Sequence, residues 1–230
     1  GIAHEIKNPL TPIQLNTQRL KKKYYENRED FARVFDESIN IISQEVEGMK
    51  DLLNEFLRFS RMPTPDPQPI SLHKIIDDIL ISYSEHEKNI HIKKNLDPNL
   101  AQLTIDPEQI RRVLINLFEN ATDAIDEGGI IQITTKILEG KKWVRIEFSD
   151  NGAGISSSDR EKLFLPHFTT KKRGTGLGLA IVNRIIIDHN GTIKVQDNYP
   201  KGTTFIIDLP YSQTTLKTDK TFPKSLSGIS

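Results

Sequence analysis

The sequence predicts an antiparallel helical hairpin followed by a two-layer α/β sandwich, and three features of the chain support this fold class. Residues 1–61 carry apolar side chains at alternating spacings of three and four, the period of an amphipathic helix. Residues 62–70 hold four prolines, which a helix cannot accommodate. Between residues 71 and 211, helical and strand-like patterns are mixed, as in one sheet with helices on one face.

Composition and charge exclude several classes of function. The 230 residues contain 31 Lys plus Arg and 31 Asp plus Glu, so no net charge attracts nucleic acid or an anionic membrane. The absence of cysteine excludes disulfides, thiolate metal sites and cysteine nucleophiles. No apolar run reaches the ~20 residues that span a bilayer, so we expect no membrane contact. Because the chain does not begin with Met and a strong motif starts at once, we expect a piece of a longer protein.

The first two helices are expected to pair and then to dimerise. Their apolar seams are Ala3, Ile6, Leu10, Ile13, Thr17, Leu20 and Tyr24, and then Phe35, Ile39, Ile42, Val46, Met49, Leu53 and Phe56. Two helices joined by a short polar turn near Glu26–Glu29 cannot cover faces of this width, whereas a bundle of four can. The sequence therefore predicts a homodimer in which each hairpin is half of a four-helix bundle. The alternative is a hairpin that packs only on its own C-terminal domain.

The proline-rich segment divides the chain. The second helix must end near Arg61, residues 62–70 form a semi-rigid linker, and residues 71–211 form the second domain. Residues 212–230 are rich in Ser, Thr and Lys, and we expect a disordered tail there. Within the second domain we expect helices over about 71–85, 107–126 and 176–189, and strands near 90–94, 102–105, 130–138, 143–149, 192–196 and 203–209.

The helix that begins after Asp106-Pro107 carries a polar line. Asn116, Asn120 and Asp123 lie at positions i, i+4 and i+7, on one face. An asparagine carbonyl is a neutral oxygen ligand suited to a Mg²⁺ ion that bridges phosphates, and Asn120 is the candidate. Taken alone, the same line is equally consistent with a solvated helix face.

Two glycine-containing motifs follow. Asp150 ends a predicted strand, where a carboxylate can accept a hydrogen bond from an adenine amino group, and Gly152 and Gly154 allow the backbone to approach the ring. Further on, a basic segment over 164–173 leads into the glycines of 174–178, which open a helix whose amides can bind phosphate. Either motif alone could be an ordinary turn, because a lone glycine-rich stretch is weak evidence.

In their order and spacing, four segments resemble the N, G1, F and G2 boxes of the histidine-kinase ATPase superfamily (GHKL, HATPase_c): Asn116–Ala121, Asp150–Gly154, Phe164–Phe168 and Gly174–Gly178. Residues 201–205 resemble the last strand of that fold, where Thr204 would lie near the adenine. The resemblance covers 71–211 and implies the Bergerat ATP-binding fold with ATP and Mg²⁺ as cofactors. It implies binding roles for Asn116, Asn120, Asp123, Asp150, Gly152, Gly154, Ile155, Phe168, Thr170, Lys171, Gly174, Thr175, Gly176, Leu177, Gly178 and Thr204, with Asn120 on the metal.

The N-terminal string Ala3–Pro12 resembles the H box of sensor histidine kinases, within a HisKA dimerisation and phosphoacceptor domain. Here His4 would be the phosphoacceptor, because one ring nitrogen can attack while the other keeps its proton. Glu5 would orient that N–H or take up a proton, and Asn8, four residues on, would place the water that hydrolyses phosphohistidine. An isolated surface histidine is the alternative.

The resemblance implies a two-component sensor kinase that moves the γ-phosphate of ATP to His4 and then to an aspartate of a response regulator. The H box is most similar to nitrogen-regulation kinases, NtrY-type more than NtrB-type, whose partner would be an NtrX-like or NtrC-like regulator. The chain would be the cytoplasmic portion of an inner-membrane sensor anchored upstream.

Two competing functions remain. An ATP-driven clamp of the Hsp90, MutL or gyrase kind has a glutamate general base where Asn116 stands, and we expect the nearby Glu119 to point elsewhere on the helix. A scaffold that senses ATP without kinase activity is the other.

Overall fold

A computed structural model of the protein describes residues 2–26, 29–60, 62–83, 90–126, 128–140, 142–171 and 174–211. It leaves out the side chains of residues 2–6, 51, 52, 54–56, 58–60, 82 and 83. The predicted tail, residues 212–230, therefore lies outside the described residues. No described helix has both the length and the apolar character needed to cross a membrane.

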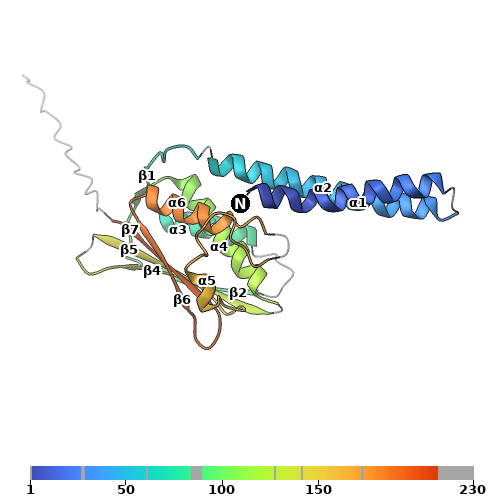
Figure 1. Cartoon of the computed structure of the whole chain (residues 1–230). Coiled ribbons are helices and arrows are strands. Elements are labelled where there is room, and N and C mark those ends of the chain that lie inside the picture. Colours follow the sequence, from blue (N-terminus) through green and yellow to red (C-terminus); the bar gives the residue numbers. More distant parts are fainter. Residues whose placement is uncertain are drawn as a thin grey trace, which may run out of the picture.

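The N-terminal part is a helical hairpin. Helix α1 covers Ile2–Tyr25 and helix α2 covers Phe31–Ser60, and the two pack side by side and extend away from the rest of the molecule (Figure 1). Val34 and Ser38 of α2 are buried in this hairpin, with 1% and 0% of their surfaces exposed. The expected hairpin is confirmed, and residues 27 and 28 of its turn lie outside the described residues.

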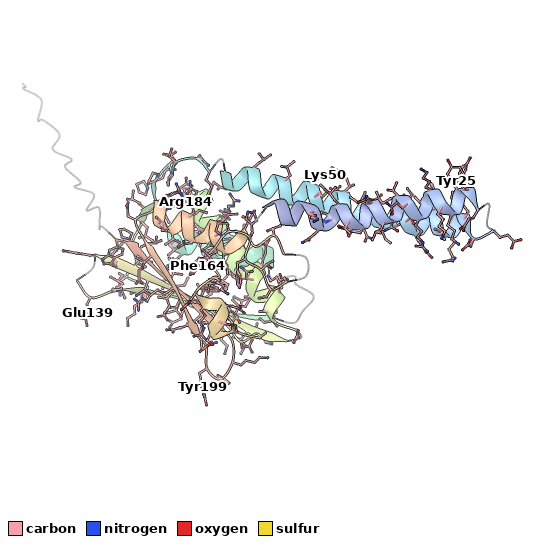
Figure 2. All side chains as sticks on the ribbon, in the orientation of Figure 1. Tyr25, Lys50, Glu139, Phe164, Arg184 and Tyr199 are labelled. Carbon is pink, nitrogen blue, oxygen red and sulfur yellow. The ribbon has the colours of Figure 1, made fainter. Side chains whose placement is uncertain are left out.

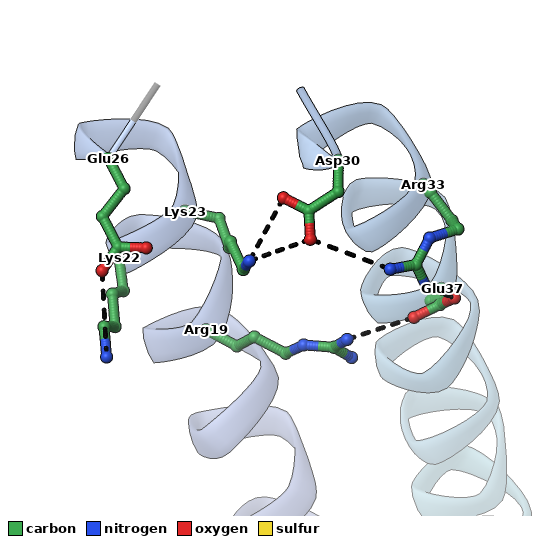
Figure 3. A network of polar contacts seen from close by, with 7 residues as sticks. All are labelled: Arg19, Lys22, Lys23, Glu26, Asp30, Arg33 and Glu37. Carbon is green, nitrogen blue, oxygen red and sulfur yellow. Dashed lines mark hydrogen bonds and ion pairs between the residues drawn. The ribbon is translucent and has the colours of Figure 1, made fainter. Parts of the chain in front are cut away.

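Ion pairs join the two helices near their connecting turn (Figure 3). Lys23 Nζ lies 2.9 Å from Asp30 Oδ2, and Arg19 Nη2 lies 3.2 Å from Glu37 Oε2. Arg33 Nη1 also donates to Glu37 at 2.6 Å, and hydrogen bonds from the cations hold the carboxyl pKa values of Asp30 and Glu37 below their usual range. These exposed pairs fix the register of the two helices more than they add stability.

The C-terminal part has a mixed sheet with helices on one face (Figure 1). Five strands pair in the order β2-β4-β5-β7-β6; β2 runs parallel to β4, and the other neighbours are antiparallel. The bounds are β1 Gln68–Ile70, α3 Leu72–Tyr83, β2 Ile90–Asn95, β3 Leu103–Ile105, α4 Pro107–Ala124, β4 Gly129–Ile137, β5 Trp143–Asp150, α5 Ser157–Arg160, α6 Gly178–Asp188, β6 Thr192–Asp197 and β7 Thr203–Pro210.

The core lies between the sheet and helices α3, α4 and α6. Apolar residues alternate along β5 and β7, and they meet the apolar stripe of α4. The rings of Phe118 in α4 and Phe148 in β5 pack edge to face with their centroids 4.8 Å apart. This packing fixes α4, and with it Asn116, Asn120 and Asp123, relative to the end of β5.

The proline-rich segment is bound to the second domain and is not a free linker along its whole length. Its strand β1 pairs antiparallel with β3. The backbone N–H of Asp66 donates to Asp106 Oδ2 at 3.0 Å, and Gln109 Nε2 donates to the carbonyl of Pro63 at 3.1 Å. The same Asp106 caps α4 through Oδ1, so one carboxylate serves both the helix and the linker.

Candidate nucleotide site

Helix α4 supplies the polar wall of the site. Asp106 accepts hydrogen bonds from the N–H groups of Glu108 and Gln109, and Pro107 occupies the first turn, so the helix begins where the sequence predicts. Asn116 donates through Nδ2 to the carbonyl of Arg112 at 2.8 Å. That bond directs its Oδ1 toward α6, where a Cβ added at Gly178 would lie 2.7 Å from it. Gly178 therefore has no room for a side chain.

Asp150 lies at the end of β5, buried on the helix side of the sheet with 3% of its surface exposed. Its Oδ1 accepts hydrogen bonds from the N–H groups of Gly152 at 2.9 Å and Thr203 at 3.3 Å. Burial raises the pKa of this carboxyl above its ordinary value, and the two backbone donors oppose that rise. Because both bonds end on Oδ1, Oδ2 is left to accept a hydrogen bond from another group.

The glycines after Asp150 let this loop meet the end of α4. The N–H of Ala153 donates to the carbonyl of Ala124 at 2.9 Å. A Cβ at Gly152 would lie 2.6 Å from the same carbonyl oxygen, and Gly154 has a φ of 80°. The expected approach of these glycines to an adenine ring stays a prediction; in the structure Gly152 meets the C-terminal turn of α4, and a Cβ at Gly154 would lie 3.4 Å from the carbonyl oxygen of Gly202.

The segment from His167 to Leu177, which we call the lid segment, crosses the mouth of the site; residues 172 and 173 lie outside its described part. The N–H of His167 donates to the carbonyl of Gly176 at 3.0 Å, and both residues have positive φ, 67° and 65°. Leu177 is fully buried and anchors the C-terminal end of the segment. Helix α6 then begins without a side-chain cap, so its first amides remain suited to an anion.

Two adjoining cavities lie between these elements. The larger, about 490 Å³, is lined by Asn116, Glu119, Asn120, Asp123, Phe168, Thr169, Lys171, Gly174, Thr175, Gly176, Gly178 and Leu179. The smaller, about 190 Å³, is lined by Asn120, Ala124, Asp150, Gly154, Ile155, Ser156, Asp159, Leu163, Phe168, Thr169, Thr170, Lys171, Leu179, Thr203 and Phe205. We call them the α4 cavity and the Asp150 cavity. Five residues line both, so the two are parts of one elongated site.

Lys171 connects the lid segment to α4. Its Nζ lies 2.9 Å from Asn120 Oδ1 and 2.7 Å from Asp123 Oδ2. Two oxygens of the predicted polar line therefore converge on one cation. A positive charge of the lid segment is thus held by two oxygens of α4.

Most of the predicted binding residues come together here, and three take other places. Gly152 packs on α4, and Leu177 is in the core. Thr204 lines neither cavity, because its hydroxyl is 2.9 Å from Ser149 Oγ. Thr203, one residue earlier, lines the Asp150 cavity in its place, since alternate residues of a strand point to opposite faces.

The expectation that Glu119 points away from the site is wrong. Glu119 lines the α4 cavity. Residues three apart on a helix lie on neighbouring positions of one face, so Glu119 follows Asn116 even though it is next in sequence to Asn120. Thr169 and Leu179 were also missed; Thr169 directly follows the segment 164–168 and Leu179 directly follows Gly178, and these neighbouring motifs are the signal that could have found them.

The predicted phosphoacceptor region lies in α1. His4 and Glu5 are within the helix, but their side chains lie outside the described residues. Asn8, one turn further on, is exposed.

Along the hairpin, large apolar side chains of α2 are exposed at heptad-like spacing. They are Phe35, Ile39, Val46, Leu53 and Leu57, which are 38–57% exposed, and Leu10 and Leu15 of α1 are also exposed. Residues spaced in this way form one stripe along the helix. Phe35 and Ile39 each follow a buried residue, Val34 and Ser38, by one position, so the stripe lies about 100° around α2 from its buried face.

Two family models match the chain. Residues 105–213 match HATPase_c, described as histidine kinase-, DNA gyrase B-, and HSP90-like ATPase, and residues 1–65 match HisKA, the His Kinase A (phospho-acceptor) domain. The class defined by fold and site is thus an ATPase-type nucleotide-binding domain joined to a phosphoacceptor hairpin.

Individual relatives carry both parts. The chain is 32% identical to the sensor histidine kinase ZraS of Escherichia coli over 93% of its length and 45% of ZraS, and 33% identical to the nitrogen regulation protein NtrY of Azorhizobium caulinodans over 87% of its length and 26% of NtrY. It thus spans less than half of these curated relatives.

Solved structures agree with this fold. The catalytic domain of the histidine kinase ThkA is 34% identical with a TM-score of 0.57, over 64% of this chain and 96% of that one. ThkA in complex with the response regulator protein TrrA gives a TM-score of 0.69 at 30% identity, over 92% of this chain and 60% of that one. The chain belongs to the sensor histidine kinase family of two-component systems and corresponds to its catalytic core.

Proposed function

We propose that the chain binds Mg-ATP in the two joined cavities and transfers the γ-phosphoryl group to His4. The observation that carries this proposal is the arrangement of the site. A buried carboxylate with an available oxygen lies at one end, and helix oxygens, a lysine and helix N-terminal amides lie at the other. Such a site matches a nucleotide, whose base is read by hydrogen bonds and whose phosphates need cations and amides.

The Asp150 cavity would take the adenine and the α4 cavity the phosphates. Oδ2 of Asp150 would accept from the exocyclic amino group, and Thr203 would lie beside the ring. Lys171 would exchange its contacts with Asn120 and Asp123 for the phosphates as the lid segment closes.

Asn120 would hold Mg²⁺, with Asn116 alongside. Both asparagines line the α4 cavity, and an amide oxygen is a ligand suited to an ion that is otherwise bound by phosphate oxygens. When bound, the ion neutralises charge on the transferred phosphoryl group. The protein supplies positioning, because phosphoryl transfer needs little other covalent help.

The acceptor would be the imidazole of His4. Glu5 would orient its ring or take up its proton, and Asn8 would support the reverse, phosphatase reaction by placing a water. The exposed stripe of α2 would be covered by the same stripe of a second copy, since such a row of large apolar side chains is typical of a coiled-coil seam. The active form would be a homodimer with a four-helix bundle.

The phosphoryl group would pass to an aspartate of a response regulator receiver domain. We propose an NtrX-like or NtrC-like regulator, on the basis of the H-box string; overall identity does not separate the NtrY relative from ZraS, 33% against 32%. The chain would be the cytoplasmic portion of an inner-membrane sensor.

Incubation with [γ-³²P]ATP tests the proposal directly. We expect a label that is acid-labile and alkali-stable and that is lost in His4→Gln, and phosphotransfer to candidate regulators identifies the partner. Asn120→Asp should weaken Mg-ATP binding. A label that persists in His4→Gln, or undiminished affinity in Asn120→Asp, would contradict the assignments of those two residues.

A second function has one observation in its favour. Glu119 lines the α4 cavity, where a carboxylate could activate water as in an ATP-hydrolysing clamp. Steady release of phosphate that is abolished in Glu119→Gln, without any labelled protein, would favour the clamp. A labelled protein whose formation survives Glu119→Gln would exclude it.

A further inference from the structure

The turn between β6 and β7, residues 198–202, contacts the backbone of Asp150. The side-chain Nδ2 of Asn198 donates to the carbonyl oxygen of Asp150 at 2.7 Å, and the N–H of Asn198 donates to the carbonyl of Gly202 at 3.0 Å. Asn198 is partly buried, whereas its neighbour Tyr199 points outward from the tip of the turn with 93% of its surface exposed (Figure 2). One side chain of this turn is therefore directed inward, at the residue that would read the base.

The bond to Asn198 takes the place of a missing ladder bond. Strands β5 and β7 pair as far as Ser149 and Thr204, and Asp150 follows after the last pair. Asp150 is still paired with Ile131 of β4 but has no pair in β7, so on that side its buried carbonyl needs another donor. Asn198 supplies that donor, and the N–H of Thr203 meets the carboxylate of the same residue at 3.3 Å. Asp150 is thus held through its main chain by the turn and through its side chain by Thr203, the first residue of β7.

Two further features keep the turn in this position. Gly202 has a φ of 120°, and any Cβ there would overlap the carbonyl oxygen of Asp150, so only glycine allows this approach. Asp197, at the end of β6, is paired with Arg160, which also donates to the carbonyl of Ile155 at 3.3 Å. The turn is therefore tied both to Asp150 and to the loop that follows it.

We propose that Asn198 is a positioning residue for base recognition: it holds the main chain of Asp150 so that the carboxylate Oδ2 points into the Asp150 cavity at an exocyclic amino donor. This inference rests on the proposed function and names a determinant of its specificity. Asn198 itself touches no nucleotide. Without this hydrogen bond, the end of β5 can move and the orientation of the carboxylate is no longer fixed. The affinity for a purine nucleotide with a 6-amino group then no longer exceeds the affinity for one without it.

The test compares ATP with purine riboside 5′-triphosphate, which lacks only the 6-amino group, by titration calorimetry on the whole chain. A hydrogen bond to a charged acceptor predicts that the wild type prefers ATP by roughly tenfold or more. Asn198→Ala should reduce this preference to about twofold or less while the affinity for purine riboside triphosphate stays unchanged. Tyr199→Phe, a change at the exposed tip of the same turn, should keep the wild-type preference.

The outcomes separate the inference from the proposed function. If Asn198→Ala keeps the full preference for ATP, or loses affinity for both nucleotides equally, the positioning role is wrong while nucleotide binding stands. If the wild type binds neither nucleotide, the proposed function itself is wrong. If the alanine variant does not fold, Asn198→Asp replaces it, because aspartate has the same shape without the donor and should also reduce the preference for ATP. A preference for ATP that is kept in Asn198→Gln would support the role of the amide.

Discussion

Replacement of Asp150 by asparagine should separate ATP affinity from stability. Asparagine can keep its oxygen at the Oδ1 position, where it accepts the N–H groups of Gly152 and Thr203. Its NH₂ then occupies the Oδ2 position and presents a donor to the donor of the adenine. The lost hydrogen bond to a charged acceptor corresponds to about 1.5–3 kcal/mol, and hence to roughly a 10- to 150-fold weaker affinity for ATP.

The same change should not destabilise the fold at neutral pH. Burial raises the pKa of Asp150 above its ordinary value of 3.8, so the folded state binds this proton more tightly than the unfolded chain does. Ionisation therefore costs folding free energy, a cost that is absent below pH 3.8 and complete once the pH exceeds the folded-state pKa. Asparagine does not ionise, so Asp150→Asn should be at least as stable as the wild type at pH 7, and any gain should vanish below pH 3.8.

Titration calorimetry with ATP and urea unfolding at pH 7 and pH 3.5 measure the two effects. Asp126→Asn, an exposed carboxylate just beyond α4, is the matched control and should change neither quantity. The reasoning is refuted if Asp150→Asn binds ATP as well as the wild type does. It is also refuted if the urea midpoint of the variant, measured relative to that of the wild type, is lower at pH 7 than at pH 3.5.

Three further changes test other parts of the molecule. Gly176→Ala should weaken ATP binding by roughly tenfold, because φ is 65° and the new Cβ would lie 2.5 Å from the carbonyl carbon of His167; calorimetry measures this. Ser38→Ala removes a fully buried hydroxyl that has no hydrogen-bond partner among the described residues, and should raise the melting temperature by about 2–4 °C in a thermal scan. Leu53→Lys should convert a dimer to monomers in light scattering, since it puts a charge in the exposed stripe.

Each change has a control or a contrary result. Gly140→Ala has the same kind of backbone strain, at a φ of 82°, with open space around its Cβ, and should leave ATP affinity unchanged. Gln44→Lys, exposed on the side of α2 opposite the stripe, should leave the dimer intact. A lower melting temperature in Ser38→Ala would mean that the hydroxyl has a stabilising partner, and a monomeric wild type would remove the argument for the bundle.

Local signals were enough to predict the helices near the site. Asp106-Pro107 fixes the start of α4 because both the cap and the first-turn proline act within a few residues. The predicted end near Asp126 is two residues too long, and the helix predicted from 176 begins at Gly178, because Gly176 has positive φ. The expected end near Glu85 lies outside the described residues, and α3 is described to Tyr83.

Pairings between distant segments were beyond the sequence. The strand β1 lies within the proline-rich run, where only its partner β3 gives three residues a reason to be extended. The parallel pairing of β2 with β4 depends on a crossover through α4 that a pattern of alternation does not reveal. The position of Glu119 was predicted wrongly for a different reason, because the face that it shares with Asn116 was not considered. The same applies to the strand face of Thr204, which lines neither cavity.

The hydrogen bonds that Gln109 of α4 donates to Pro63 and that Asp66 donates to the cap residue Asp106 have a mechanical consequence. The described part of the proline-rich segment is therefore held on the nucleotide-binding domain from Pro63 onward, and a change in the angle between hairpin and domain would have to arise between Ser60 and Pro63. A connection this short would allow the domain to rotate on the end of the hairpin but would limit its translation away from the hairpin. In the function proposed above, the position of the γ-phosphate relative to His4 would depend on that angle, and a rotation of α2 would change it.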